Sequence, residues 1–147
     1  WGLAMVGRFI GSWVLRFVAP GLVLAVCAVS AATLAVLAGT ALEGTVAAVA
    51  ILSIGLFNSV MFPTIFTLSI DGLGEDTPGA SGILCLAIVG GAIVPLLMGL
   101  AADRIGLALA LLVPAVCYLW IAAYGLLMKA GMIGAARAEP AAVPTDA

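Results

Sequence analysis

The sequence predicts an all-α transmembrane protein, because its composition cannot cover a water-exposed surface and its few charges separate long apolar runs. Apolar residues make up 65% of the 147-residue chain and charged residues 8%, and the mean hydropathy is +1.36. Soluble domains are about a quarter charged. Most of the surface of this chain is therefore expected to lie in lipid.

Four charge-free runs follow one another along the chain, at residues 17–42, 44–70, 77–102 and 105–128. Each is longer than the roughly 20 residues that a helix needs to cross a hydrocarbon core of about 30 Å. A fifth apolar stretch, at residues 1–15, is shorter and contains Arg8. The sequence thus predicts about four complete helices, preceded by the end of a fifth. The expected spans are residues 1–17, 21–41, 44–70, 80–102 and 106–128.

The beginning of the chain indicates a fragment. Its first residue is Trp1, whereas an intact product would begin with Met. The alternative, a secretory signal over residues 1–40, would need a basic start followed by one short apolar core. Arg8 and Arg16 instead lie within and after an apolar stretch, and further spans follow. We therefore expect the first residues to be the tail of a membrane helix.

The basic residues predict the orientation of the spans, because Lys and Arg near span ends favour the cytoplasm. If the first, partial helix runs inward, four basic residues lie on the cytoplasmic side and one lies outside. The four are Arg8, Arg16, Lys129 and Arg137, and the fifth is Arg104. The opposite orientation would invert this ratio. We therefore expect a multi-pass membrane protein with a cytoplasmic C-terminus. The high Ala and Gly content indicates a bacterial genome, so the expected location is the bacterial inner membrane.

The membrane domain is expected to cover residues 1–128. The remaining residues, 129–147, are rich in Ala and Pro and have no apolar face. Segments of this kind bury too little apolar surface to fold. We predict a disordered cytoplasmic tail.

The chain lacks the residue clusters of metal sites and hydrolases. It contains no His, which removes the commonest proton shuttle and metal ligand. Its cysteines are scattered without C-x-x-C spacing and are expected to be packing residues: Cys27, Cys85 and Cys117. Asp71, Glu75 and Asp76 share a loop with glycines, which favours a solvated turn. No catalytic residue, metal, cofactor or nucleic-acid partner is predicted, and the chain is not expected to be an enzyme.

Polar residues gather at the centre of the run 44–70, in the stretch "FNSVMFPTIF" at 57–66. Polar groups at this depth usually face the interior of a helix bundle or a water-filled cavity. Pro63 removes the backbone hydrogen bond to the carbonyl of Ser59 and is expected to kink the helix. Two interpretations stay open: a polar patch that faces a substrate, or Asn58 hydrogen-bonded to a neighbouring helix with Pro63 setting only the curvature.

Helical spacing predicts which residues accompany Asn58. Residues three or four positions apart lie on one face of a helix. The face that carries Asn58 is expected to contain Gly55, Asn58, Phe62, Ile65 and Ser69.

The next run contains a second stretch that favours bending, "VGGAIVPLLMG" at 89–99. Its small and kinking residues are Gly90, Gly91, Pro95 and Gly99. A Pro within a Gly-rich stretch is a place where a helix can bend. Interrupted helices in successive spans are typical of transporters. The alternative is close packing of helices at the glycines without any motion.

Three stretches, taken in order, resemble the C-terminal half of the fucose/galactose/glucose proton symporter family of the major facilitator superfamily. They are "GRFIGSWVLRFVAPG" (7–21), "GLFNSVMFPTIFTLSIDGLGEDT" (55–77) and "AIVGGAIVPLLMGLAADRIG" (87–106). Together they cover most of residues 1–125, a far more specific signal than the single G-x-x-x-G of Gly7 and Gly11. The resemblance implies the end of helix eight and then helices nine to twelve of a twelve-helix transporter.

The resemblance also implies roles for individual residues. Gly7, Arg8 and Arg16 correspond to a cytoplasmic gating motif between helices eight and nine, although Arg8 alone has an alternative as a snorkelling residue. The helix of Asn58 would line the central cavity. Candidate substrate-facing residues on it are Asn58, Phe62, Ser59 and Thr64, and periodicity favours Asn58 and Phe62 over Thr64.

The implied activity is uptake of a monosaccharide together with a proton by alternating access. The implied partners are the lipid bilayer and the missing N-terminal half. In such a transporter the proton-linked carboxylates belong to that N-terminal half, and every Asp and Glu of this chain lies at a span end, in a loop or in the tail. The chain alone is therefore not expected to transport. It is also expected to be poorly stable alone, because half of the cavity would expose polar groups without the facing half. The alternatives are a drug or organic-ion exporter of the same fold and a small structural membrane subunit. Fucose, glucose, galactose and N-acetylglucosamine are all compatible with the sequence.

Overall fold

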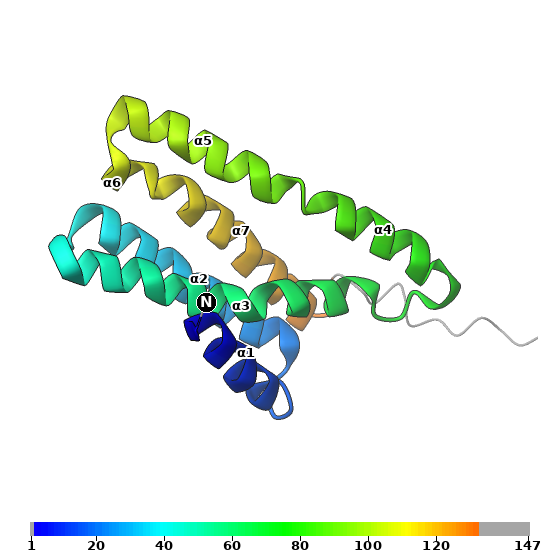
Figure 1. Cartoon of the computed structure of the whole chain (residues 1–147). Helices are drawn as coiled ribbons and strands as arrows, with labels where there is room; N and C mark the ends of the chain where they lie inside the picture. The colour runs from blue at the N-terminus through cyan, green and yellow to red at the C-terminus, as the bar shows by residue number, and fades with distance from the viewer. Residues whose placement is uncertain (1, 133–147) are drawn as a thin grey trace, which may run out of the picture.

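The computed structural model describes residues 2–132, and every regular element in this part of the chain is helical (Figure 1). The elements are α1 (Gly2–Val14), α2 (Pro20–Thr40), α3 (Gly44–Ile70), the 3-10 turn η1 (Gly74–Asp76), α4 (Thr77–Ala87), α5 (Gly90–Ile105), α6 (Leu107–Ala110) and α7 (Leu112–Lys129). Most of the predicted tail, from residue 133 onward, lies outside the described residues.

Four stretches within residues 2–132 are long and apolar enough to cross a membrane: Pro20–Thr40, Gly44–Ile70, Gly74–Ile105 and Leu107–Lys129. The first two are single helices, the third contains η1, α4 and α5, and the fourth contains α6 and α7. The shorter helix α1 precedes them. The predicted all-α transmembrane fold is therefore confirmed.

The sequence explains where several helices begin and end. Pro20 occupies the first position of α2, where its fixed φ suits a helix and its missing N–H costs nothing. Gly106 ends α5 with a φ of +85°, a backbone conformation that side-chain-bearing residues rarely adopt. This glycine separates α5 from α6 and turns the chain back across the membrane.

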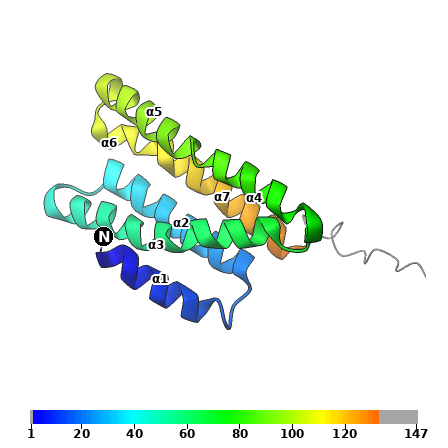
Figure 2. The same ribbon diagram turned by 45° about the vertical axis from the view of Figure 1, so that its right-hand side comes forward.

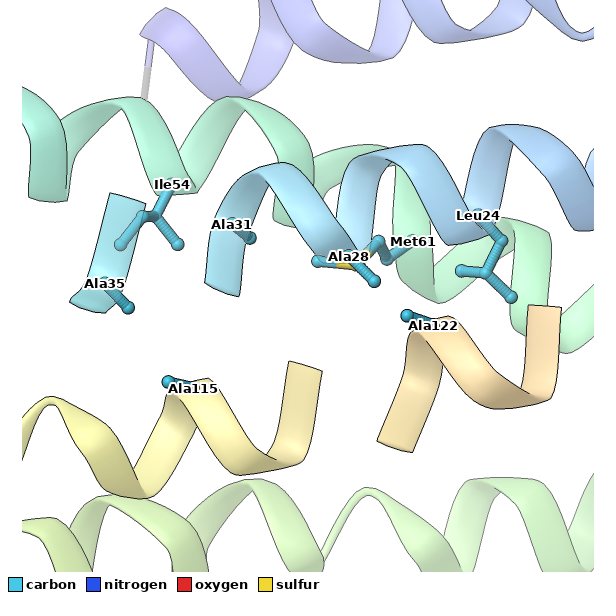
Figure 3. Close-up of a cluster of buried hydrophobic side chains, with 8 residues drawn as sticks. All are labelled: Leu24, Ala28, Ala31, Ala35, Ile54, Met61, Ala115 and Ala122. Atoms are coloured by element: carbon cyan, nitrogen blue, oxygen red, sulfur yellow. The ribbon is translucent and has the colours of Figure 1, made fainter. Parts of the chain in front are cut away.

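The core is built around α2, which lies between α3 and α7 (Figure 3). Its inward face is a row of alanines at helical spacing, and Ala28, Ala31 and Ala35 are completely buried. Small residues let helix backbones approach closely, which is the main source of helix association in membranes. Ile54 and Met61 of α3 pack against this row from one side, and Ala115 and Ala122 of α7 pack from the other (Figure 3).

Two glycines mark the closest approach of α2 and α7. A Cβ atom added to Gly21 would lie 2.7 Å from the carbonyl oxygen of Gly125, and one added to Gly125 would lie 2.7 Å from the carbonyl oxygen of Gly21. Neither position has room for a methyl group. The crossing of these helices therefore depends on glycine at both residues.

The α1–α3 contact uses the Gly7 and Gly11 pair. A Cβ atom on Gly7 would collide with Ser59 and with the carbonyl of Leu56, and one on Gly11 would lie 2.5 Å from the Val60 side chain. The G-x-x-x-G spacing, which is a weak signal in the sequence, thus places α1 against the middle of α3.

The span expected at 80–102 is divided into two helices. The break lies at Ile88 and Val89, just before the glycine pair and six residues before Pro95. Around it, backbone N–H groups donate hydrogen bonds to the carbonyl three residues earlier instead of four. The N–H of Ile88 donates to the carbonyl of Cys85 at 3.2 Å, and the N–H of Gly91 donates to the carbonyl of Ile88 at 2.8 Å. Such tightened turns often mark hinges. Pro63, by contrast, lies inside the unbroken α3.

The outer helices α4 and α5 run beyond α7 on the side away from α2 (Figures 1 and 2). None of their residues is buried. Their apolar side chains are broadly exposed, as for Leu86, which is 77% accessible. A surface of this kind needs lipid or a further membrane helix to cover it.

Candidate functional site

The polar residues of α3 divide between two faces. Asn58 and Phe62 are four positions apart and both exposed, and Phe62 is 52% accessible. Ser59 and Thr64 are buried at 8% and 2% accessibility. Of the four residues predicted to face a substrate, the structure therefore brings Asn58 and Phe62 together on an open face and turns Ser59 and Thr64 toward the helix packing.

The two buried hydroxyls are satisfied within α3 itself. Ser59 Oγ donates to the carbonyl of Leu56 and Thr64 Oγ1 donates to the carbonyl of Val60, each at 2.7 Å. Bonds of this type keep a hydroxyl inside the helix packing without an external partner. The assignment of Ser59 and Thr64 to a substrate site stays a prediction, and this placement does not favour it.

Asn58 is anchored to another helix. Its Nδ2 donates a hydrogen bond of 2.9 Å to Oη of Tyr118 in α7, sixty residues away in sequence. An amide side chain has two N–H groups and a carbonyl oxygen, so one N–H and Oδ1 are not used by this bond. The two interpretations of Asn58, helix packing and substrate contact, are therefore compatible.

A second tyrosine joins the same pair of helices. The hydroxyls of Ser69 in α3 and Tyr124 in α7 lie 3.0 Å apart. Sequence analysis missed both tyrosines. They are the only two in the chain and lie six residues apart in one apolar span. A Tyr hydroxyl in an apolar setting usually finds a hydrogen-bond partner. The presence of two tyrosines in one apolar span was therefore the signal that could have identified them.

An apolar groove of about 450 Å³ separates α3 from the α4–α5 break. It is lined by Phe62, Ile65, Leu84, Ala87, Ile88 and Gly91. Its volume lies within the range of about 300–1,000 Å³ that is usual for small-molecule sites. Phe62 thus presents its ring to a groove whose other wall contains the interrupted backbone.

The predicted hinge glycines have no neighbour that would require close packing. A Cβ atom added to Gly90, Gly91 or Gly99 would meet nothing within 4 Å in the described part of the chain. The packing alternative for "VGGAIVPLLMG" therefore finds no support at these three glycines among residues 2–132, although Met98 of the same stretch packs against a buried cluster that contains Ala38 and Leu111. Pro95, inside α5, cannot donate a backbone hydrogen bond to the carbonyl of Gly91. The hinge role of this stretch stays a prediction that its geometry favours.

The three residues of the predicted gating motif do not gather at one point. Gly7 is buried against α3, and Arg8 is exposed on the same helix. Arg16 lies about two helical turns further on, in the exposed connection between α1 and α2. Gly7 therefore has a packing function in the structure, and the gating role of all three stays a prediction.

The acidic residues near the α3–α4 connection are exposed, at Asp71, Glu75 and Asp76. Among residues 2–132, no group of three or more His, Cys, Asp and Glu side chains is placed to hold a metal ion. The chemistry available at the open face of α3 is therefore that of an amide, an aromatic ring and an apolar groove.

No protein-family model matches the chain, but several curated transporters are similar to it. A glucose/galactose transporter of Brucella abortus (strain 9-941) is 56% identical over 127 residues, which is 86% of this chain and 31% of the relative. A putative glucose/galactose transporter of Helicobacter pylori (strain J99) is 43% identical over 131 residues, 86% of this chain and 32% of the relative. The L-fucose-proton symporter of Escherichia coli K12 is 39% identical over 114 residues, 77% of this chain and 26% of the relative.

A crystal structure of the Escherichia coli fucose:proton symporter matches the fold with a TM-score of 0.82 at 35% identity, over 86% of this chain and 31% of that one. A major facilitator superfamily transporter crystallised in the outward conformation matches equally well, over 30% of its length. The chain spans about a third of the length of the first curated relatives. The resemblance predicted from the sequence is confirmed: the fold is that of part of a major facilitator superfamily transporter, and the relatives named here are transporters rather than enzymes.

Proposed function

We propose that this chain, a homologue of sugar transporters over most of its length, is part of a secondary active transporter that takes up a monosaccharide together with protons. The observation that carries the proposal is that Asn58 and Phe62 are both exposed, four residues apart on α3, and that Phe62 lines an apolar groove. The similarity to glucose/galactose transporters and an L-fucose-proton symporter supports it.

The chemistry of this face suits a sugar. A monosaccharide presents apolar C–H groups on its ring faces and hydroxyls around its edge. The exposed ring of Phe62 offers an apolar surface for the C–H groups. The amide of Asn58 can donate to one hydroxyl and accept from another. Together the two residues supply one side of a site, and the facing side belongs to the rest of the transporter.

The broken outer helix supports alternating access, in which two halves of a transporter move about a central site. The break at Ile88 and Val89 lies on the wall of the same groove that contains Phe62. A sugar bound there would touch both α3 and a segment that can bend. We assign the hinge function to this break together with the glycine pair and Pro95.

The coupling proton is assigned to a part of the transporter outside this chain. The carboxylates among the described residues lie at helix ends or in connections and are exposed: Glu43, Asp71, Glu75, Asp76 and Asp103. Proton coupling needs an ionisable group that can be buried within the membrane and titrate there. The missing N-terminal half is the proposed source of that group.

The proposed topology places α1 at the end of helix eight and the four long spans at helices nine to twelve. Figure 2 shows the α1–α2 connection, the α3–α4 connection and the end of α7 at one end of the molecule, with the α2–α3 and α5–α6 connections at the other. Arg16 and Lys129 belong to the first end, and Arg104 belongs to the second. We assign the first end to the cytoplasmic side of a bacterial inner membrane.

The test is uptake of labelled sugars by the complete gene product that carries this sequence, expressed in transport-deficient cells. Glucose, galactose, fucose and N-acetylglucosamine are offered with and without an uncoupler, to wild type and to Asn58→Ala. We expect uncoupler-sensitive uptake of at least one sugar and a marked rise in KM for Asn58→Ala. If a correctly inserted wild type takes up none of them, the proposal is wrong and an exporter of the same fold becomes the leading alternative.

A further inference from the structure

We infer that Tyr118 is a positioning residue for sugar binding: its hydroxyl fixes the amide of Asn58 in the orientation that presents the remaining polar atoms to the substrate. This inference rests on the proposed function and assigns a role in the site to α7, a helix that sequence analysis left out of it. It starts from the hydrogen bond of 2.9 Å between Asn58 Nδ2 and Tyr118 Oη.

The two partners of this bond differ in their surroundings. Asn58 is exposed on α3, whereas Tyr118 is half-buried and packs against the main hydrophobic cluster of α2, α3 and α7. The ring of Tyr118 is thus held by packing, and its hydroxyl is a fixed point from which Asn58 is held. An exposed side chain is in this way tied to the main hydrophobic cluster.

The direction of the bond decides which atoms of Asn58 remain available. Since Nδ2 donates to the tyrosine, Oδ1 and the second N–H are the groups left for a ligand. The terminal torsion of Asn is otherwise broad, with no single preferred amide orientation. Fixing it before the sugar arrives removes an ordering cost from binding, which is the usual benefit of preorganisation.

The chain contains a matched control for this role. Tyr124 and Ser69 join the same two helices through their hydroxyls at 3.0 Å. Ser69 lies eleven residues beyond Asn58, about three helical turns away, and is the last-but-one residue of α3. Removing either tyrosine hydroxyl deletes one contact between α3 and α7. Only the removal at Tyr118 releases a residue of the proposed sugar site.

The experiment compares Tyr118→Phe, Tyr124→Phe, Asn58→Ala and the double variant Asn58→Ala/Tyr118→Phe in the complete gene product. For each, the concentration dependence of sugar uptake and the thermal stability in detergent are measured. We expect Tyr118→Phe to raise KM about fivefold with Vmax close to wild type, the effect of one lost hydrogen bond. Tyr124→Phe should change stability to a similar extent and leave KM unchanged. In the Asn58→Ala background, Tyr118→Phe should add nothing to KM.

Two results would overturn the inference. One is a wild-type KM for Tyr118→Phe in a stable protein, and the other is an equal rise in KM with or without Asn58. If Tyr118→Phe does not reach the membrane, the pair Tyr118→Gln and Tyr118→Leu replaces it, because only Gln supplies an acceptor. The Gln variant should then have the lower KM, and equal values would contradict the role. A wild type without sugar uptake would instead refute the proposed function, and this inference with it.

Discussion

At the scale of single residues, Asn58 is held on one side by Tyr118 and is exposed on the other. Polar side chains within a membrane are expensive and usually functional. Here the amide contributes to helix association and also leaves polar atoms at an open face. A residue that is held in place by a neighbouring helix and still has free polar atoms is a strong candidate for binding a small polar molecule.

Phe62 provides a residue-scale prediction. The residue is 52% exposed, so little packing is lost when its ring is removed. Phe62→Ala in the complete gene product should lower stability by less than about 1 kcal/mol, whereas truncating a buried Phe costs about 3–5 kcal/mol. The KM for sugar should rise about tenfold, because the apolar surface under the sugar ring is lost.

The control for this prediction is Phe62→Trp, which keeps an aromatic face at the groove. Its KM should stay close to that of wild type. Both values come from the concentration dependence of sugar uptake, and stability comes from thermal unfolding in detergent. A wild-type KM for Phe62→Ala would remove Phe62 from the site.

Sequence reasoning at this scale succeeded where spacing decided the answer. The period of a helix predicted that Asn58 and Phe62 share a face and that Thr64 points elsewhere, and the structure places all three in that way. Ser59 follows Asn58 directly, and its burial against Gly7 depends on where α1 packs. The Tyr118 contact joins residues sixty positions apart, so no local pattern could reveal it.

At the scale of helices, small residues determine how the elements pack. Gly21 and Gly125 bring α2 and α7 into backbone contact, and the alanine row of α2 continues the same interface. Periodicity along α2 gives little guidance, because a span surrounded by helix on one side and lipid on the other is apolar all round. The buried face can be recognised only by its lack of large side chains.

Gly125→Ala tests this packing. The added Cβ atom would lie 2.7 Å from the carbonyl oxygen of Gly21, so the helices must move apart. We expect a loss of stability of about 1–3 kcal/mol, the usual cost of overpacking. Gly99→Ala is the matched control, because its Cβ atom would meet no atom of residues 2–132 within 4 Å.

Thermal unfolding of the complete gene product in detergent measures both variants. The control should be neutral or slightly stabilising, since Ala is the better helix former. Equal stability of the two variants would mean that the backbones of α2 and α7 are not in contact at Gly21 and Gly125.

The interrupted outer helix shows what sequence reasoning could not place. The stretch 89–99 was expected to bend, and the break lies at its first residue, Val89, and at the preceding Ile88 rather than at Pro95. Proline weakens the turn before it, while the position of the break depends on which backbone groups the surroundings can satisfy. The position of the break therefore depends on the packing of α4 and α5 and cannot be predicted from local composition.

At the scale of the whole molecule, the number of spans follows from hydrophobic length, and charge placement predicts their orientation. Neither indicates which helices are neighbours. The resemblance to sugar symporters, carried by three ordered motifs, predicted which helices of a twelve-helix transporter these spans are. Their neighbours come from the structure, in which α2 packs against both α3 and α7. The exposed apolar surfaces of α4 and α5 are consistent with a chain that covers about a third of its relatives.

The central claim is that the face of α3 carrying Asn58 and Phe62 contacts the sugar. Its most direct test is cysteine protection in the complete gene product, after the free cysteines Cys27, Cys85 and Cys117 have been replaced by alanine. Asn58→Cys and Thr64→Cys are then labelled with a small water-soluble maleimide, without the transported sugar and with it at a concentration well above the raised KM expected for loss of the Asn58 amide. Labelling of Asn58→Cys that the sugar slows, with Thr64→Cys unlabelled, is the predicted result. Labelling of Thr64→Cys that the sugar slows, with Asn58→Cys unaffected by sugar, would contradict the account.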